Sequence, residues 1–137
     1  MWLYTDKGHI SVVVHDRAPN KVLLRSRSQG TLPLLVSNGE ERQSYTPNRD
    51  YYYRIITSKT EFKQILNKYI DLMAYTNFKD HIAKPDSVLS DEHVKAYHDV
   101  YWAGGRTVDK HPNKKAYEDG YEEGYSIGNA DNFWNKE

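Results

Sequence analysis

The sequence predicts an α+β fold: a mostly antiparallel three- to four-stranded sheet with one main helix packed on a face, plus one or two C-terminal helices. Alternating apolar residues separated by turn signals predict strands in the first 57 positions, and a capped amphipathic segment predicts the main helix directly after them. With 137 residues in total, we expect an α+β domain over 1–105 and a linker with a C-terminal Tyr/Gly/acidic helix and tail over 106–137.

The expected strands follow one another along the chain. Residues 2–5 and 9–15 form a hairpin through Gly8, which can adopt the positive φ of a tight turn. A second turn over 16–20 leads to a strand over 21–27, and residues 50–57 supply a fourth strand rich in β-branched and aromatic side chains. Between the last two strands we expect a short helix over 31–37, closed by Gly39, and a polar surface loop over 40–49.

The main helix begins at a capping box formed by Ser58 and Glu61. Behind it one apolar stripe recurs at helical spacing, through Phe62, Ile65, Leu66, Tyr69, Ile70 and Met73. We expect this helix to end near Tyr75 and to pack on the sheet. We expect a second helix from Ser90 to Ala103. It has fewer apolar residues on one face, so we expect it to lie outside the main core.

Composition narrows the function classes. The 19 basic and 19 acidic residues cancel, which argues against a dedicated non-specific DNA binder, whose affinity comes mainly from phosphate neutralisation. The absence of cysteine excludes disulfides, thiolate metal sites and a cysteine nucleophile. No run approaches the roughly 20 apolar residues of a membrane span, and no signal-peptide pattern is present, so we expect a cytoplasmic protein without a membrane partner.

Motifs of catalysis and metal binding are missing from the sequence. Neither a Gly-rich phosphate loop nor a G-x-S-x-G elbow occurs, and the adjacent carboxylates are typical of helix N-termini and solvated faces. His93 and His98 are five positions apart, about 140° around a helix, and do not converge on a metal. We therefore expect no catalytic residue, no metal and no cofactor.

Six of the seven arginines fall in the first 54 residues. Strand alternation places Ile10, Val12, Val14, Val22, Leu24 and Ser26 on an apolar face under the main helix. The opposite face collects the candidate ligand-binding residues His15, Lys21, Arg25, Arg27, Tyr52 and Arg54. Arginine forks bind phosphates and tyrosine stacks on bases, which favours an anionic nucleotide or nucleic acid. Alternatively, these charges protect an open sheet face from aggregation.

The C-terminal segment repeats tyrosine and glycine every four residues beside carboxylates. Exposed aromatics of this kind suit protein binding. The candidate partner-binding residues are Tyr117, Glu118, Tyr121, Glu122, Tyr125 and Trp134. Alternatively, this helix docks its tyrosines onto its own domain. Tyrosine-rich surfaces also allow a homodimer.

Several short pieces occur in an order and spacing that suggest a family: Met1-Trp2-Leu3, Ser11-Val12-Val13, Leu24-Arg25-Ser26-Arg27, Tyr53-Arg54-Ile55-Ile56, Glu61-Phe62, Tyr75-Thr76-Asn77-Phe78-Lys79 and Tyr97-His98-Asp99-Val100-Tyr101-Trp102. On these pieces, residues 1 to about 102 resemble a group of small uncharacterised proteins from bacteria and their phages. The resemblance implies an accessory or host-interaction role and carries over no functional residue. The tail over 116–124 is similar to the Gly-Tyr helical opening of ribosome-modulation-factor-like proteins, although its acidic residues depart from that basic family.

Together these observations favour a non-enzymatic accessory protein of the phage or mobile-element type, which binds and blocks or sequesters a host protein as an inhibitor or counter-defence factor. The alternative is a binder of an anionic nucleotide or nucleic-acid ligand through the arginine and tyrosine face of the sheet. A small enzyme of unknown class is the third possibility, because the geometry of a site is invisible in sequence.

Overall fold

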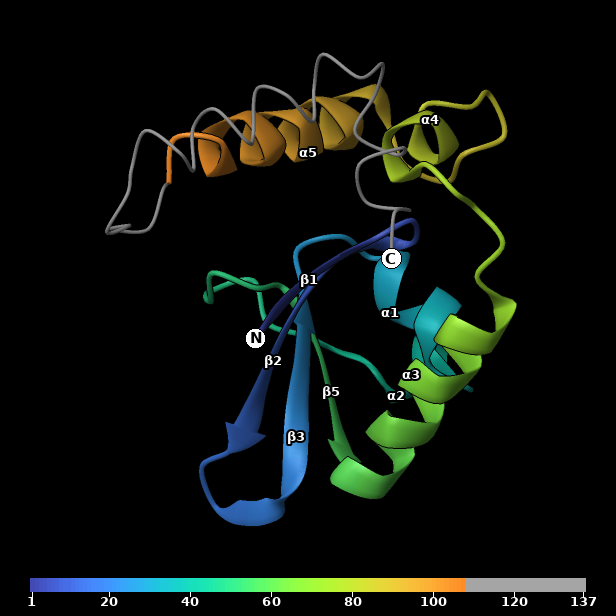
Figure 1. The fold of residues 1–137 in the computed structure, drawn as a ribbon. Coiled ribbons are helices and arrows are strands. Elements are labelled where there is room, and N and C mark those ends of the chain that lie inside the picture. Colours follow the sequence, from blue (N-terminus) through green and yellow to red (C-terminus); the bar gives the residue numbers. More distant parts are fainter. Residues whose placement is uncertain (108–137) are drawn as a thin grey trace, which may run out of the picture.

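The computed structural model describes residues 1–107 and shows an α+β fold, as expected (Figure 1). One antiparallel sheet has the strand order β1-β2-β3-β5-β4. Its strands are β1 (Trp2–Thr5), β2 (Gly8–His15), β3 (Ala18–Ser26), β4 (Ser44–Tyr45) and β5 (Tyr53–Ser58). The helices are α1 (Thr31–Leu35), α2 (Gly39–Arg42), α3 (Lys59–Leu72), α4 (Phe78–Ile82) and α5 (Asp91–Gly104).

Four of these strands correspond to predicted ones, although β3 begins three residues earlier and β5 three residues later than expected, and the segment between β3 and β5 differs. The expected loop over 40–49 contains the short helix α2 and the two-residue edge strand β4, which makes the sheet five-stranded. The first hairpin turn depends on Gly8, whose φ is +134°, and a side chain at this position would collide with Thr31. Glycine is therefore required there by both backbone conformation and space.

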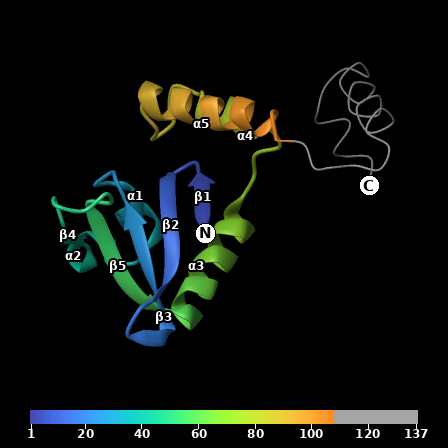
Figure 2. The same ribbon diagram turned by 90° about the vertical axis from the view of Figure 1, so that its left-hand side faces the viewer.

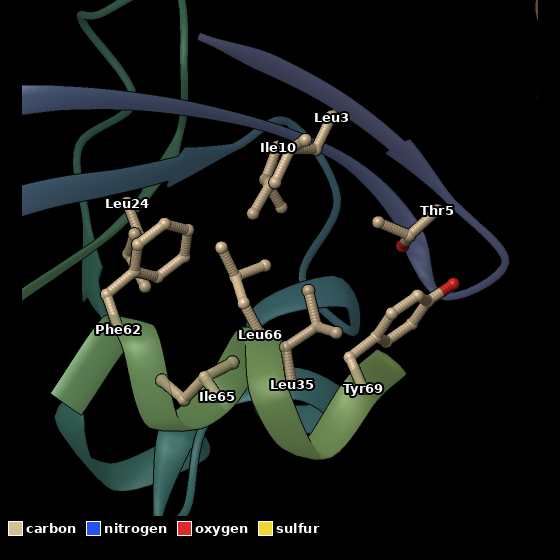
Figure 3. A pocket seen from close by; sticks show the side chains of 9 residues that line it. All are labelled: Leu3, Thr5, Ile10, Leu24, Leu35, Phe62, Ile65, Leu66 and Tyr69. Carbon is tan, nitrogen blue, oxygen red and sulfur yellow. The ribbon is translucent and has the colours of Figure 1, made fainter. Parts of the chain in front are cut away.

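The main core lies between one face of the sheet and the helices α1 and α3. Its buried members are Ile10, Val12, Val22, Leu24, Leu32, Val36, Ile55 and Phe62. The predicted apolar face is correct except at Val14, which is exposed beside a register shift at the end of β2. An apolar void of about 20 Å³ remains between sheet and α3 (Figure 3), enough for about one water molecule.

Helix α3 begins as predicted, because the Ser58 side chain accepts a hydrogen bond from the backbone N–H of Glu61. The Glu61 carboxylate is engaged elsewhere, since it accepts a 2.6 Å bond from Arg42 of α2. The helix ends at Leu72 rather than near Tyr75. Consequently the last positions of the predicted apolar stripe, Ile70 and Met73, are exposed.

Helices α4 and α5 form a second, smaller core of Ile82, Leu89 and Tyr97. Helix α5 begins at the predicted cap, Ser90, and crosses one end of the sheet (Figures 1 and 2). Polar contacts fasten it there: Tyr97 Oη donates to the Thr5 carbonyl at 2.9 Å. Among residues 1–107, no helix has the length and apolarity needed to cross a membrane.

Candidate functional site

Within residues 1–107, no helix lies over the face of the sheet opposite α1 and α3, and α5 reaches only its end, where Tyr97 contacts Tyr4 (Figure 1). On this outer face, cross-strand pairing aligns one residue from each strand in a row, namely Trp2, Ser11, Arg25, Arg54 and Ser44. Directly opposite residues of antiparallel strands project to the same side, with about 4.8 Å between neighbouring strands. The register therefore places Arg25 beside Arg54, as the sequence predicts.

A buried tyrosine lies at the centre of the arginine cluster. The Tyr51 side chain is 5% exposed, and the guanidinium carbons of Arg25 and Arg27 lie 4.7 Å and 4.9 Å from its ring centroid. Such cation–π contacts hold guanidinium groups in place without neutralising them. The predicted aromatic residue Tyr52 is exposed directly before β5, which begins at Tyr53 rather than at residue 50, and its role in ligand binding stays a prediction.

Arg54 is the most enclosed of the three arginines, with a side chain that is 13% exposed. Its Nε donates to Thr46 Oγ1 at 3.3 Å and to the Tyr51 carbonyl at 3.4 Å. Its Nη2 lies 3.7 Å from the Asp50 carboxylate, which itself faces solvent. Arg54 is thus a fixed cation with one partly screening acidic neighbour.

Arg25 and Arg27 keep free hydrogen-bonding capacity. Arg25 Nη2 donates to Ser11 Oγ at 2.7 Å, while its Nε is buried without a hydrogen-bond partner. Arg27 is exposed, and within residues 1–107 its one hydrogen bond goes to the backbone carbonyl of Asp50, at 3.4 Å. Within the described part of the chain, neither side chain pairs with a carboxylate.

The crowding of positive charge is visible in the pKa values of neighbouring groups. Burial, followed by the charge of Arg27, lowers the pKa of His9 and keeps this ring neutral at pH 7. Burial also lowers the pKa of Arg54, and the nearby charges of Arg25 and Arg49 lower it further. A bound anion would relieve this repulsion.

One aromatic side chain at this site was not recognised in the sequence. Trp2 stands at the end of the row, is 66% exposed and contacts the His9 ring edge-on at 6.2 Å between centroids. An exposed indole next to an arginine cluster offers a stacking surface for a flat ring. The alternation of β1 could have revealed it, since Trp2 and Tyr4 share the face that carries His9.

The other predicted face residues, His15 and Lys21, lie away from the cluster. His15 is at the opposite end of β2, where its Nδ1 accepts from the backbone N–H of Arg17 at 3.1 Å. Lys21 pairs with Ser58 at the far end of β5. A row formed by Val13, Leu23 and Ile56 separates them from the arginines. His15 and Lys21 therefore lie apart from the arginines, while Tyr52, next to Tyr51 in the chain, stays a candidate.

A second site is a cleft of about 520 Å³ between the β1–β2 turn, α1, the end of α3 and α4. It is lined by Asp6, Lys7, Leu34, Leu35, Ile65, Lys68, Tyr69, Leu72, Met73, Ala74, Tyr75, His81 and Lys84. Nothing in the sequence indicated it, because these residues come from four separated segments.

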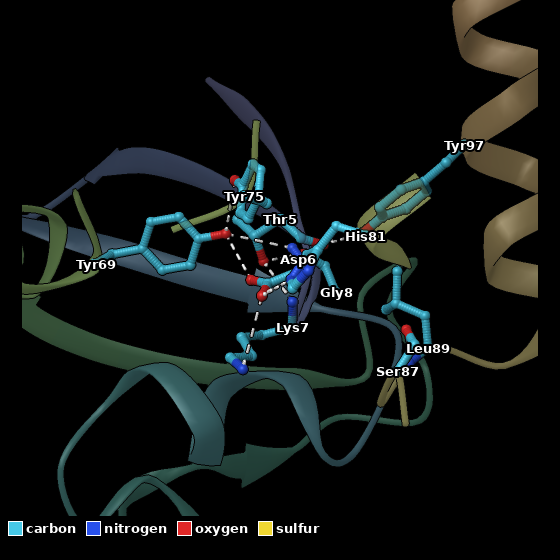
Figure 4. A network of polar contacts seen from close by, with 10 residues as sticks. All are labelled: Thr5, Asp6, Lys7, Gly8, Tyr69, Tyr75, His81, Ser87, Leu89 and Tyr97. Carbon is cyan, nitrogen blue, oxygen red and sulfur yellow. Dashed lines mark hydrogen bonds and ion pairs between the residues drawn. The ribbon is translucent and has the colours of Figure 1, made fainter. Parts of the chain in front are cut away.

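Asp6 is the centre of a polar network at one wall of this cleft (Figure 4). Tyr69 Oη donates to its Oδ1 at 2.6 Å, and His81 Nε2 donates to its Oδ2 at 2.8 Å. Lys7 Nζ lies 3.7 Å away, and the Tyr75 ring stacks on His81 at 4.5 Å. Helix α4 brings His81 to a partner that is 75 positions away in the sequence.

The network changes the pKa of both central groups. Partial burial alone would raise the pKa of Asp6, yet the hydrogen bonds from Tyr69 and His81 and the charge of Lys7 outweigh burial and hold it below its ordinary value. Burial, with the hydrogen bond to Asp6, raises the pKa of Tyr69 well above its ordinary range. At neutral pH the network therefore contains a carboxylate and an undissociated phenol.

Two further expectations concern metals and the C-terminal surface. Over residues 1–107 no group of three or more potential metal ligands comes together. The candidate partner-binding residues Tyr117, Glu118, Tyr121, Glu122, Tyr125 and Trp134 lie outside the described residues. Comparison with models of protein families, with curated proteins and with solved structures gave no significant match, so function has to be argued from geometry.

Proposed function

We propose that the outer face of the sheet binds a phosphate-bearing nucleotide ligand, either as a free nucleotide or within a single-stranded nucleic acid. The observation that carries this proposal is the arrangement of Arg25 and Arg27 over the buried Tyr51 ring, without an acidic partner among the described residues. Arg27 donates to a backbone carbonyl and Arg25 to the Ser11 hydroxyl, and among the described residues neither guanidinium is neutralised by a carboxylate.

Different residues of the row can contact the phosphate and the base of such a ligand. The planar forks of Arg25 and Arg27 match phosphate oxygens, and Arg54 adds a fixed positive charge beside them. Trp2 lies two strands from Arg25, about 10 Å away by strand spacing, and can stack on a base whose phosphate contacts the arginines. Phosphate contacts and stacking are both insensitive to base identity, so we expect little sequence preference.

A fluorescence anisotropy titration tests the proposal, with a labelled single-stranded oligothymidine as probe and unlabelled ATP as competitor. Arg27→Gln should weaken binding about fivefold to tenfold, because one charge-assisted contact is lost. Arg17→Gln is the matched control, since Arg17 is an exposed arginine at the β2–β3 turn, away from the cluster. Trp2→Ala should weaken oligonucleotide binding by a similar factor through the loss of stacking.

Competition by ATP distinguishes a site for a free nucleotide from a site for a single strand. Competition by ATP at a concentration near that of the oligonucleotide would indicate a nucleotide site, and failure of ATP to compete would indicate a strand. Equal binding by the Arg27→Gln and Arg17→Gln proteins would refute the proposal. Affinity should also fall with added salt, because phosphate binding releases counterions.

Inhibition of a host protein through the tail stays a prediction, because its residues lie outside the described part of the chain. Deletion of 112–137 distinguishes the two hypotheses: it should preserve oligonucleotide binding by the sheet face and abolish the capture of a protein partner by the tail.

A further inference from the structure

We propose that the cleft between α1, α3 and α4 binds a small amphipathic carboxylate, a molecule with an apolar chain and one anionic head. This second site is independent of the sheet face. Its volume of about 520 Å³ falls within the range of small-molecule pockets, roughly 300–1,000 Å³. Three features of the cleft favour this occupant: its apolar wall, its charge and its size.

The apolar wall exposes large side chains that would ordinarily be buried. Leu34 of α1 is 53% exposed, and Leu72 and Met73 at the end of α3 are 72% and 45% exposed. Each costs free energy in water in proportion to its apolar area. Because the three lie around one hollow rather than scattered over the surface, a single apolar chain can cover all of them.

The charges in the cleft favour an anionic head. The single carboxylate in its lining, Asp6, is already neutralised by the bonds from Tyr69 and His81 and by Lys7. Lys68 and Lys84 also line the cleft and are exposed, and among residues 1–107 neither forms an ion pair. The surplus charge is therefore positive, which disfavours an amine and favours a carboxylate.

The size of the cleft favours a small molecule over a protein surface. Tyr69 and Tyr75 form part of the lining together with the Asp6 network, which joins the sheet to α4 (Figure 4). A stable protein interface needs roughly 800 Å² from each partner, in general over a flatter area. A short acyl chain fits within the cleft, and its carboxylate can then lie near Lys68 and Lys84.

Isothermal titration calorimetry of the full chain tests the ligand class with decanoate, decanol and decylamine, each below the concentration at which it forms micelles. These probes share one apolar chain and differ in the charge of the head. We expect decanoate to bind about fivefold more tightly than decanol, and decylamine to bind most weakly. Equal affinities for the three probes, or no heat with decanoate, would overturn the proposal. Binding to anionic phospholipid vesicles without binding to monomeric decanoate would also overturn it.

Two matched pairs of variants locate the bound molecule. Leu72→Gln should weaken decanoate binding about fivefold to tenfold, whereas Ile70→Gln should not, since Ile70 is an equally exposed apolar residue of α3 that does not line the cleft. Lys68→Ala should reduce the preference for decanoate over decanol, with Lys63→Ala as the control on the same helix. All four positions are exposed or partly exposed, so the variants should keep the thermal unfolding midpoint of the parent.

Two results would place the molecule elsewhere: equal effects within either pair, or loss of decanoate binding in the Arg27→Gln protein. The Arg27→Gln protein also keeps this proposal separate from the one for the sheet face, because it should lose oligonucleotide affinity and keep decanoate affinity.

Discussion

Removal of the Asp6 carboxylate should destabilise the protein more than any other single change at the surface of the cleft. The side chain is 16% exposed and accepts two short hydrogen bonds, from Tyr69 and His81. A hydrogen bond to a charged group contributes about 1.5–3 kcal/mol. Because the His81 side chain is about one-third exposed and regains water, we expect Asp6→Ala to lower the free energy of unfolding by about 2–3 kcal/mol in total.

Urea denaturation at neutral pH measures this loss, with Asp16→Ala as the matched control. Asp16 also lies in a turn between strands, but its side chain is 84% exposed, and its carboxylate lies 3.6 Å from His15 Nδ1, which accepts a hydrogen bond from the backbone N–H of Arg17. The control should change the free energy of unfolding by less than about 0.5 kcal/mol. If Asp6→Ala costs no more than Asp16→Ala, the network does not fasten α4 to the sheet and the reasoning is wrong.

The same network predicts a pH dependence with a definite sign. The pKa of Asp6 is lower in the folded chain than in the unfolded chain, where it is about 3.9. Its contribution is therefore complete above about pH 5 and is lost as the pH falls through the folded pKa. The difference in unfolding free energy between the parent and Asp6→Asn should shrink below about pH 4. A difference that stays constant down to about pH 2 would contradict the lowered pKa.

Two further changes test the helices. Ser58→Ala removes the cap of α3 and should cost about 1 kcal/mol in urea denaturation, and a cost within the error of the measurement would show that the 3.0 Å bond to Glu61 contributes nothing. Tyr97→Phe removes the hydrogen bond to the Thr5 carbonyl and should speed amide hydrogen exchange in α5 while that of β2 stays unchanged, whereas equal acceleration in both would indicate a loss of global stability instead.

The parts of the fold that the sequence predicts correctly are those set by neighbouring residues. Gly8 adopts the positive φ of a turn, and the Ser58 side chain accepts a hydrogen bond from the amide three positions away. Strand alternation separates the two faces of the sheet. Each of these depends on fewer than about ten residues of chain, and local propensities act over that range. The same range explains the placement of Arg25 and Arg54 on one face.

The arginine cluster combines a part that strand alternation predicts with a part that it does not. Alternation correctly puts Arg54 on the face of Arg25, but it could not show that the loop before β5 places Tyr51 under Arg25 and Arg27. Alternation within β1 puts Trp2 on the same face, but its position in the row also depends on the pairing of β1 with β2 and of β2 with β3.

The cleft could not be predicted from local patterns. Asp6 meets Tyr69 across 63 positions and His81 across 75 positions. No sequence motif has either spacing, because these contacts form only when the folded chain brings α3 and α4 next to the β1–β2 turn. Leu72 and Met73 are exposed at the end of α3 and line the cleft, and no local pattern relates them to the β1–β2 turn or to α4.

The distribution of charge, rather than its sum, decides which functions the chain can perform. The whole sequence is neutral, but residues 1–107 hold 15 basic and 12 acidic side chains. Several of the acids lie in the first turns of helices, where the helix dipole stabilises them, while Arg25, Arg27 and Arg54 share the open side of the sheet. A local surplus of this kind acts over about one Debye length, about 8 Å at physiological salt, and is not cancelled by carboxylates on the other side of the molecule. Neutral composition therefore excludes a uniformly basic nucleic-acid binder and leaves room for a confined anion site on a neutral protein.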